Sequence, residues 1–224
     1  MGVVGTFSYI RSQVSPAVKI VAVSKNQGTD SILQLYNVGH RLFGESKVQE
    51  LMQKYRELPN DIQWHMIGHL QRNKVKYVAP FVALIHSVDS ITLLEEIDKQ
   101  GKKNNRIIDY LFELRIAAEE SKYGLSSEQL HAIIASGDYA RFSFARPCGL
   151  MGIASFTDNR EQIRKEFMLL HDSFLALKEK YFSDKPWFSE LSMGMSNDYP
   201  IALDCGSTML RLGTIIFGQS DYAK

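Results

Sequence analysis

Val18-Lys19-Ile20-Val21-Ala22-Val23-Ser24-Lys25 is an apolar, β-branched run that ends abruptly in the polar stretch Asn26-Gln27-Gly28-Thr29-Asp30. A short apolar run with such a boundary predicts a strand that is buried on both faces. Seven further runs of this kind follow along the chain, and longer amphipathic stretches separate them. The strands that we predict are residues 19–23, 41–43, 63–67, 84–87, 107–114, 147–151, 187–192 and 209–212.

The stretches between these strands have the spacing of helices. We predict helices over residues 29–38, 46–55, 72–79, 90–101, 127–136, 159–181 and 197–204, and one more from about 6 to 13, before the first strand. Ser127 and Asp158 are the N-caps that we expect for two of them. Strands that alternate with helices indicate parallel βαβ units.

Eight such units close naturally into an α/β fold of the TIM-like (β/α)₈ barrel type, here with an additional N-terminal helix. A doubly wound open sheet is the alternative. No Gly-x-Gly-x-x-Gly follows the first strand, which counts against the dinucleotide-binding form of that alternative. We predict one domain over residues 1–224.

Composition narrows the classes of protein to which the chain can belong. It has 224 residues, with 26 Lys+Arg against 25 Asp+Glu, so no basic field indicates a nucleic-acid partner. Cys148 and Cys205 are too few for a disulfide framework. Residues 1–15 lack a basic start followed by a long apolar stretch, so we predict neither a signal peptide nor a membrane partner, and expect a cytoplasmic protein.

Lys25 is the first candidate functional residue, because functional groups of a barrel lie at the carboxyl ends of its strands. Poor solvation at the end of a buried strand disfavours the charged form of an amine. A neutral amine is a nucleophile and forms a Schiff base with an aldehyde. The alternative is that Lys25 simply extends from the barrel mouth into solvent.

The seventh and eighth strands are followed by candidate anion-binding loops. Gly194 would allow the backbone to approach an anion closely, and Ser196 is expected to open the next helix. Gly213 and Thr214 repeat this pairing of a small residue with a hydroxyl after the eighth strand. Barrels often hold phosphate at these two places, although Gly and Ser are also common in ordinary loops.

Arg211 lies within the eighth predicted strand and keeps its charge even when buried, so it needs a partner. That partner is either a carboxylate in a structural ion pair or a bound ligand. His65 and His69 are four residues apart, a spacing that could bind zinc on a helix. Here they lie in a predicted strand that Gly68 interrupts, so we predict no metal site.

Six motifs occur in order over about residues 18 to 218, and together they resemble the pyridoxal phosphate homeostasis proteins. The motifs are Ala22-Val23-Ser24-Lys25, Phe43-Gly44-Glu45-Ser46-Lys47-Val48-Gln49-Glu50, Trp64-His65-Met66-Ile67-Gly68-His69-Leu70-Gln71-Arg72-Asn73-Lys74, Gly149-Leu150-Met151, Leu191-Ser192-Met193-Gly194-Met195-Ser196 and Gly206-Ser207-Thr208-Met209-Leu210-Arg211-Leu212-Gly213.

The resemblance implies a single-domain barrel similar to the amino-terminal domain of alanine racemase. It implies that Lys25 forms an internal aldimine with pyridoxal 5′-phosphate, that Arg211 faces the pyridine nitrogen, and that Ser196, Gly213 and Thr214 hold the phosphate. The cofactor-binding residues are then Lys25, Ser46, Met193, Gly194, Ser196, Arg211, Gly213 and Thr214. Ser46 is a departure, because the family often has Asn at this position.

We therefore predict a pyridoxal phosphate-binding protein of cofactor homeostasis that is not an enzyme and has no catalytic residues. An arginine leaves the pyridine nitrogen unprotonated, which weakens the ring as an electron sink. The related racemases bring a tyrosine base from a second domain, and we expect none here because the chain ends at Lys224. A single-domain amino-acid racemase is the alternative. The partners that we expect are the cofactor and apoenzymes that receive it, with the protein a monomer or weak dimer.

Overall fold

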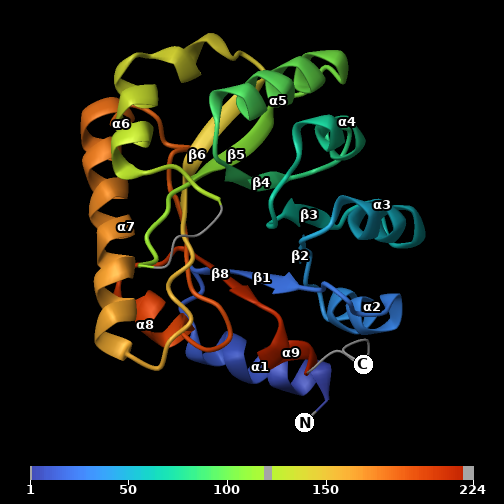
Figure 1. Ribbon diagram of the computed structural model, residues 1–224. Coiled ribbons are helices and arrows are strands. Elements are labelled where there is room, and N and C mark those ends of the chain that lie inside the picture. Colours follow the sequence, from blue (N-terminus) through green and yellow to red (C-terminus); the bar gives the residue numbers. More distant parts are fainter. Residues whose placement is uncertain (1, 119–122, 219–224) are drawn as a thin grey trace.

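The computed structural model describes residues 2–118 and 123–218, and its centre is a closed barrel of parallel strands (Figure 1). Each strand pairs with the next, and the eighth pairs with the first, so the predicted barrel is confirmed and the open sheet is wrong. The strands are β1 (Lys19–Val23), β2 (Leu42–Glu45), β3 (Gln63–Met66), β4 (Leu84–Val88), β5 (Ile108–Glu113), β6 (Ala145–Met151), β7 (Glu190–Ser192) and β8 (Met209–Leu212).

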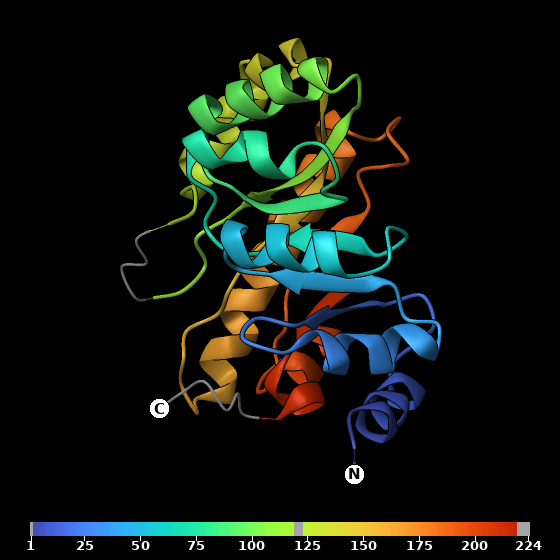
Figure 2. The same cartoon turned by 90° about the vertical axis from the view of Figure 1, so that its right-hand side faces the viewer.

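Helices follow the strands and cover the outside of the barrel, and the first five lie in succession along one side (Figure 2). They are α1 (Val3–Gln13), α2 (Thr29–Asn37), α3 (Val48–Glu57), α4 (Val75–Val78), α5 (Ile91–Lys103), α6 (Ser127–Ala135), α7 (Arg160–Tyr181), α8 (Tyr199–Asp204) and α9 (Thr214–Phe217), with 3₁₀ helices at η1 (Arg72–Lys74) and η2 (Asp138–Arg141). None of the helices in the described residues has the length and apolarity that crossing a membrane requires.

Several helix starts and two N-caps differ from those predicted. The predicted N-terminal helix is present, but it begins at Val3 rather than near residue 6. Ser126 caps α6 through a reciprocal capping box with Gln129, and Asn159 caps α7, so each cap lies one residue from the predicted position. These shifts are small because several polar residues compete for the cap at each boundary.

The core has two parts that follow from the alternation of side chains along each strand. Six residues form a separate apolar cluster inside the barrel, whereas the larger cluster joins the outer faces of the strands to the helices. On β1, Val21 belongs to the inner cluster and Ile20 and Ala22 to the outer one. The inner cluster consists of Val21, Leu84, Leu111, Cys148, Met151 and Met209.

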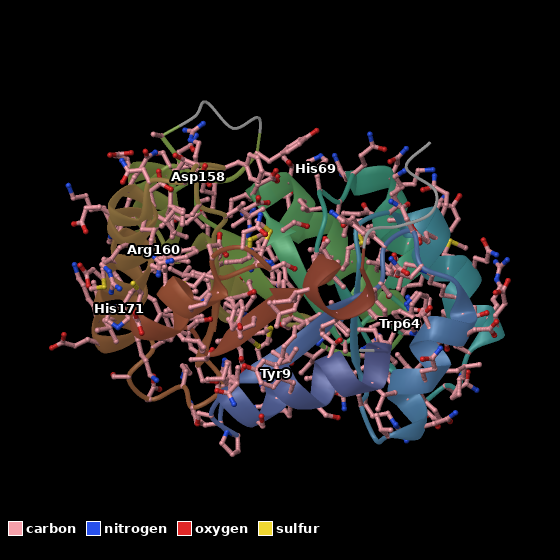
Figure 3. The ribbon with its side chains drawn as sticks, turned by 90° about the horizontal axis from the view of Figure 1, so that it is seen from below. Tyr9, Trp64, His69, Asp158, Arg160 and His171 are labelled. Carbon is pink, nitrogen blue, oxygen red and sulfur yellow. The ribbon has the colours of Figure 1, made fainter. Side chains whose placement is uncertain are left out.

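Ion pairs also join strands of the barrel. Arg146 of β6 donates to both carboxylate oxygens of Asp109 on β5, at 2.7 and 2.9 Å, and Lys19 of β1 pairs with Glu190 of β7. Because all strands are parallel, the loops that follow them gather at one end of the barrel, which we call the mouth. Figure 3 shows His69, which follows β3, and Asp158, which follows β6, on one side of the molecule, with Tyr9 of α1 on the other.

Gly149 provides a test of this strand packing. Its φ is 150°, and a Cβ atom there would lie 1.8 Å from the carbonyl oxygen of Glu190 on β7. We expect Gly149→Ala to lower the free energy of unfolding by about 3 kcal/mol, since two backbones would have to separate. Gly28→Ala is the matched control, because nothing lies within 4 Å of its added Cβ. Urea unfolding measures both, and similar small losses in the two variants would contradict this packing.

Candidate functional site

Lys25 lies immediately after β1, at the mouth of the barrel, and its side chain is exposed. The expectation that burial leaves this amine poorly solvated is therefore wrong: the strand ends at Val23, Ser24 is fully buried, and the chain emerges at the next residue. The amine is accessible to a ligand that enters the mouth. Its position at the carboxyl end of β1 is the one that the sequence predicts.

Arg211 lies on β8, the strand that pairs with β1, and its register partner there is Val21. Arg211 is 4% exposed. Its guanidinium donates to the carbonyl oxygen and the hydroxyl of Ser192 at 2.9 and 2.7 Å, and to the carbonyl oxygen of Gly152 at 3.0 Å. Desolvation lowers the pKa of Arg211 to about 10, and the charges of Asp198 and Glu113 oppose this shift.

Among the described residues, Arg211 is not in the structural ion pair that the sequence left as one alternative. Within the described ranges, no carboxylate oxygen lies within 4.0 Å of this guanidinium. Its three hydrogen bonds to protein use Nη1 and Nη2, not Nε. A buried cation that only neutral oxygens hold is electrostatically incomplete. The arrangement thus favours a ligand that accepts a hydrogen bond or carries negative charge.

Two buried histidines extend this group through the barrel interior. His86 Nδ1 lies 3.1 Å from the hydroxyl of Ser192, and His86 Nε2 lies 2.9 Å from His65 Nδ1. Burial lowers the pKa of His65 to about 3 and that of His86 well below its ordinary value, so both rings are neutral. Since Ser192 accepts from Arg211, its own proton is free to point to His86, whose Nε2–H then donates to His65.

The contact of His65 with His86 was not predicted from the sequence, where the spacing of His65 and His69 was the only histidine pattern considered. His69 lies instead in the loop after β3, stacked on Tyr123 with its Nδ1 3.5 Å from Asp89. Across residues 2–118 and 123–218, no three or more His, Cys, Asp or Glu side chains gather in a group that could hold a metal ion. His86 would have been identifiable only from its alternation with Leu84 in a strand whose residues are all buried.

The two predicted anion loops lie together at the mouth. The hydroxyl of Ser196, after β7, accepts a hydrogen bond at 3.2 Å from the backbone N–H of Ile215, after β8. Gly213 packs on the end of β1, where an added Cβ would be 3.1 Å from the carbonyl oxygen of Val23, and Thr214 is exposed. The loops thus bring hydroxyls and backbone N–H groups close to the end of β1, the strand that Lys25 follows.

Ser196 does not open a helix, contrary to the prediction. The carboxylate of Asp198 accepts from the N–H of Met195 at 2.5 Å and holds the preceding residues in a turn. The helix α8 then begins at Tyr199, with Pro200 in its first turn. An anion at Ser196 would not meet the amino terminus of α8, but the N–H of Ile215 beside its hydroxyl lies in the first turn of α9.

Met193 and Gly194, also predicted to bind cofactor, are buried in the packing. Met193 is 0% exposed, and its carbonyl oxygen accepts from the hydroxyl of Ser207. Gly194 has a φ of 97°, and an added Cβ would lie 2.6 Å from the Cβ of Ala202. Glycine is therefore required there by the approach of α8. The carbonyl oxygen of Gly194 accepts from the N–H of Arg211, which fixes the height of Arg211 in the barrel.

Ser46, the remaining predicted residue, follows β2 and is half-buried. The segment after β3 packs closely against Ser46, since a Cβ added at Gly68 would lie 2.4 Å from the carbonyl oxygen of Ser46. Behind this loop lies a buried group that was not predicted from the sequence, formed by Lys54 and Glu45, whose Nζ and Oε1 atoms are 2.8 Å apart. Lys54 was missed because its segment, Gln53-Lys54-Tyr55-Arg56-Glu57, has the composition of a solvated helix face.

A cleft of about 750 Å³ lies elsewhere, between the chain after β3 and α5. His69, Arg72, Lys76, Glu96 and Lys99 are among its lining residues. It includes none of the predicted cofactor residues, and its walls are charged and open. The candidate site is therefore the group of strand ends around Lys25 and Arg211.

Comparisons with known proteins show which proteins the chain is similar to. Residues 6–221 match the family model for the alanine racemase N-terminal domain. The pyridoxal phosphate homeostasis protein of Aquifex aeolicus is 38% identical over 206 residues, which cover 91% of this chain and 88% of that protein. PipY of Synechococcus elongatus PCC7942, solved with PLP bound, is 31% identical, with a TM-score of 0.86 over 96% of this chain and 100% of that one.

An alanine racemase from Bartonella henselae, solved with covalently bound pyridoxal phosphate, is also similar in structure. The TM-score is 0.71, the identity is 15%, and the match covers 99% of this chain but 60% of the racemase chain. At this identity the likeness shows that the two share a fold.

Glu113, at the end of β5, is a half-buried acid near the mouth that was also not predicted. Burial, and then the charge of Asp89, raises the pKa of its carboxyl from 4.5 to about 7, while Arg211 acts in the opposite direction. The folded protein therefore holds this proton more tightly than the unfolded chain. Stability consequently falls as the pH rises from about 4.5 to 7, and the full loss is present above pH 7.

Glu113→Gln removes this titration. We expect the variant to be more stable than the wild type by about 1–3 kcal/mol at pH 8, with a smaller difference at pH 5. Urea unfolding at the two pH values is the measurement. A variant that is less stable at pH 8, or a difference that does not change with pH, would contradict the raised pKa of Glu113.

Proposed function

The chain belongs to the family of pyridoxal phosphate homeostasis proteins, and we propose that it holds pyridoxal 5′-phosphate on Lys25 as part of the control of the cell's supply of this cofactor. One observation carries this proposal. Arg211, a buried cation with no carboxylate partner in the described residues, lies at the same mouth as an exposed amine and two hydroxyl-bearing loops. Similarity to PipY, solved with PLP bound, extends over nearly the whole chain.

The residues at the mouth fit each part of this cofactor. An aldehyde requires an amine, and Lys25 offers one that is accessible. The pyridine nitrogen is an acceptor, and the guanidinium of Arg211 can only donate. The phosphate requires hydroxyls and backbone N–H groups, which Ser196, Gly213 and Thr214 supply in adjoining loops.

In this proposal Lys25 binds the aldehyde as a Schiff base, and the remaining residues orient the ring. The bound cofactor can act as an electron sink for carbanions. Arg211 limits this ability, because a guanidinium does not give up its proton and leaves the pyridine nitrogen unprotonated. Ser192 and Gly152 fix the guanidinium in this role through three hydrogen bonds. Holding and releasing the cofactor suits such a site better than turnover does.

Release has a natural set of partners. Because the side chain of Lys25 is exposed, the bound aldehyde would remain accessible to amines from outside the barrel. Apoenzymes that require the cofactor are the partners that we propose to receive it, with this protein as a monomer or weak dimer in the cytoplasm. Ser46 would contribute a weaker contact than the Asn that is common in the family.

An amino-acid racemase is the second candidate, and one observation favours it. Glu113, with a pKa of about 7, can take up or release a proton near neutral pH close to the mouth. Arg211 argues against efficient racemisation, because it weakens the electron sink on which proton removal depends.

The covalent role of Lys25 can be tested with absorption spectra. Protein mixed with pyridoxal 5′-phosphate should develop a visible absorption band, and Lys25→Ala should abolish it, since Lys25 follows β1, the strand that pairs with the strand of Arg211. Lys47→Ala is the matched control, because Lys47 is an exposed lysine just before α3 and should leave the band unchanged. A band that survives in Lys25→Ala would refute the assignment, provided that circular dichroism shows both variants folded.

The choice between carrier and racemase can be tested with L-alanine in deuterated water. We expect the cofactor-loaded protein to give slow α-proton exchange at most, without racemisation, because Arg211 weakens carbanion stabilisation. Chirality and deuterium content report the two processes separately. Racemisation at about 1–10³ per second, the range of ordinary enzymes, would establish the racemase instead.

A further inference from the structure

Lys54 of α3 is a lysine buried against the strands, with 6% of its side chain exposed. Its ammonium group uses all three of its protons. It donates to the carbonyl oxygen of Ser24 at 2.7 Å, to Oε1 of Glu45 at 2.8 Å and to Oε1 of Glu50 at 2.6 Å. The partners come from three elements: the end of β1, the end of β2 and α3 itself.

The same two carboxylate oxygens also hold the residues on either side of Lys25. The hydroxyl of Ser24 donates to Oε1 of Glu45 at 2.6 Å, and the backbone N–H of Asn26 donates to Oε1 of Glu50 at 2.7 Å. Asn26 has a φ of 59°, in the left-handed region that asparagine adopts more readily than most other non-glycine residues. We call Ser24, Glu45, Glu50 and Lys54 the lysine clamp.

Stability alone does not account for this arrangement. Replacing a buried ion pair with apolar residues of similar volume is often neutral or stabilising. Here the second oxygen of Glu45, Oε2, is buried and has no hydrogen-bond partner in the described part of the chain. Burial raises the pKa of Glu45 to about 6, with Lys54 and Ser24 opposing the shift, so the carboxylate is still ionised at neutral pH. The fold thus keeps a costly buried charge immediately behind Lys25.

We propose that Lys54 is a positioning residue: through Glu45 and Glu50 it fixes the backbone on both sides of Lys25, so that the exposed amine is held at the mouth in the geometry that bond formation with the aldehyde requires. This inference rests on the proposed function. Its consequence is specific. Loss of the lysine clamp weakens only those ligands that bond to Lys25, because in the described residues no side-chain hydrogen bond or ion pair joins the clamp to Arg211 or to the loops after β7 and β8.

The test compares two ligands that differ only in the aldehyde. Pyridoxal 5′-phosphate can bond to Lys25, whereas pyridoxine 5′-phosphate carries an alcohol there and cannot. In Lys54→Met/Glu45→Gln, which removes the ion pair at nearly constant volume, we expect binding of pyridoxal 5′-phosphate to weaken roughly tenfold, as small displacements of reacting groups do. Binding of pyridoxine 5′-phosphate should stay unchanged. Equal weakening of the two ligands, or no weakening of either, would overturn the proposal.

Asp109→Asn/Arg146→Met is the matched control, because it removes a different ion pair, one between β5 and β6, and neither strand carries Lys25 or a residue of the lysine clamp. It should leave the affinities for both ligands as they are in the wild type. A thermal melt of each double variant shows that it is folded. If Lys54→Met/Glu45→Gln does not fold, Glu50→Ala replaces it, because the carboxylate of Glu50 is partly exposed and its loss removes the hydrogen bond from the N–H of Asn26 to this carboxylate.

A second measurement needs no cofactor and so separates this inference from the proposed function. In the ligand-free protein, we expect hydrogen–deuterium exchange in the peptide that contains residues 24–27 to be faster in the clamp variant than in the wild type and the control. Unchanged exchange would refute the claim that the lysine clamp fixes the backbone around Lys25, even if Lys25 binds the cofactor. Faster exchange in the clamp variant, together with a wild type that binds neither ligand, would support that claim and refute the proposed function.

Discussion

The pairing of β8 with β1 is the constraint on which the candidate site depends. Four residue pairs in register, from Lys19 with Met209 to Ala22 with Leu212, close the barrel. This closure places Arg211 beside Val21, and it brings the loops that follow β7 and β8 to the end of β1, just before Lys25. Without it, the amine and the guanidinium would lie at opposite edges of an open sheet. The chemistry of the site is thus a consequence of topology before it is one of individual residues.

Two buried cations near the mouth are held in opposite ways. Two carboxylates and a carbonyl oxygen surround Lys54, which is electrostatically satisfied and available to no ligand. Among the described residues, Arg211 donates hydrogen bonds only to neutral oxygens, those of Ser192 and Gly152, and a neutral histidine pair lies next to Ser192. The difference separates a cation that serves the structure from one that still needs an acceptor. It explains why the two residues, similar in burial and charge, have different roles in the proposed function.

Much of the fold could be predicted from the sequence, because short β-branched runs between helical stretches leave few alternatives to parallel units. The ends of β1 and β8 could be predicted from these runs, and with them the places of Lys25 and Arg211. What could not be predicted was which polar side chains the packing would bury. Lys54 has the sequence context of a solvated helix, and His86 that of an ordinary strand residue. Met193 and Gly194 lie in a motif beside the site, yet α8 and the core decide their surroundings. Lys25 itself is more exposed than the apolar run before it suggested.

The central claim is that a single amine at the carboxyl end of β1 holds the cofactor. The most direct measurement is borohydride reduction of the wild-type protein loaded with pyridoxal 5′-phosphate, followed by digestion and peptide mass spectrometry. The account predicts a phosphopyridoxyl group on the peptide that contains Lys25, with fragment ions that assign it to this residue. A stable adduct on Lys47 or Lys74 in place of Lys25, or a loaded protein that yields no adduct, would contradict it.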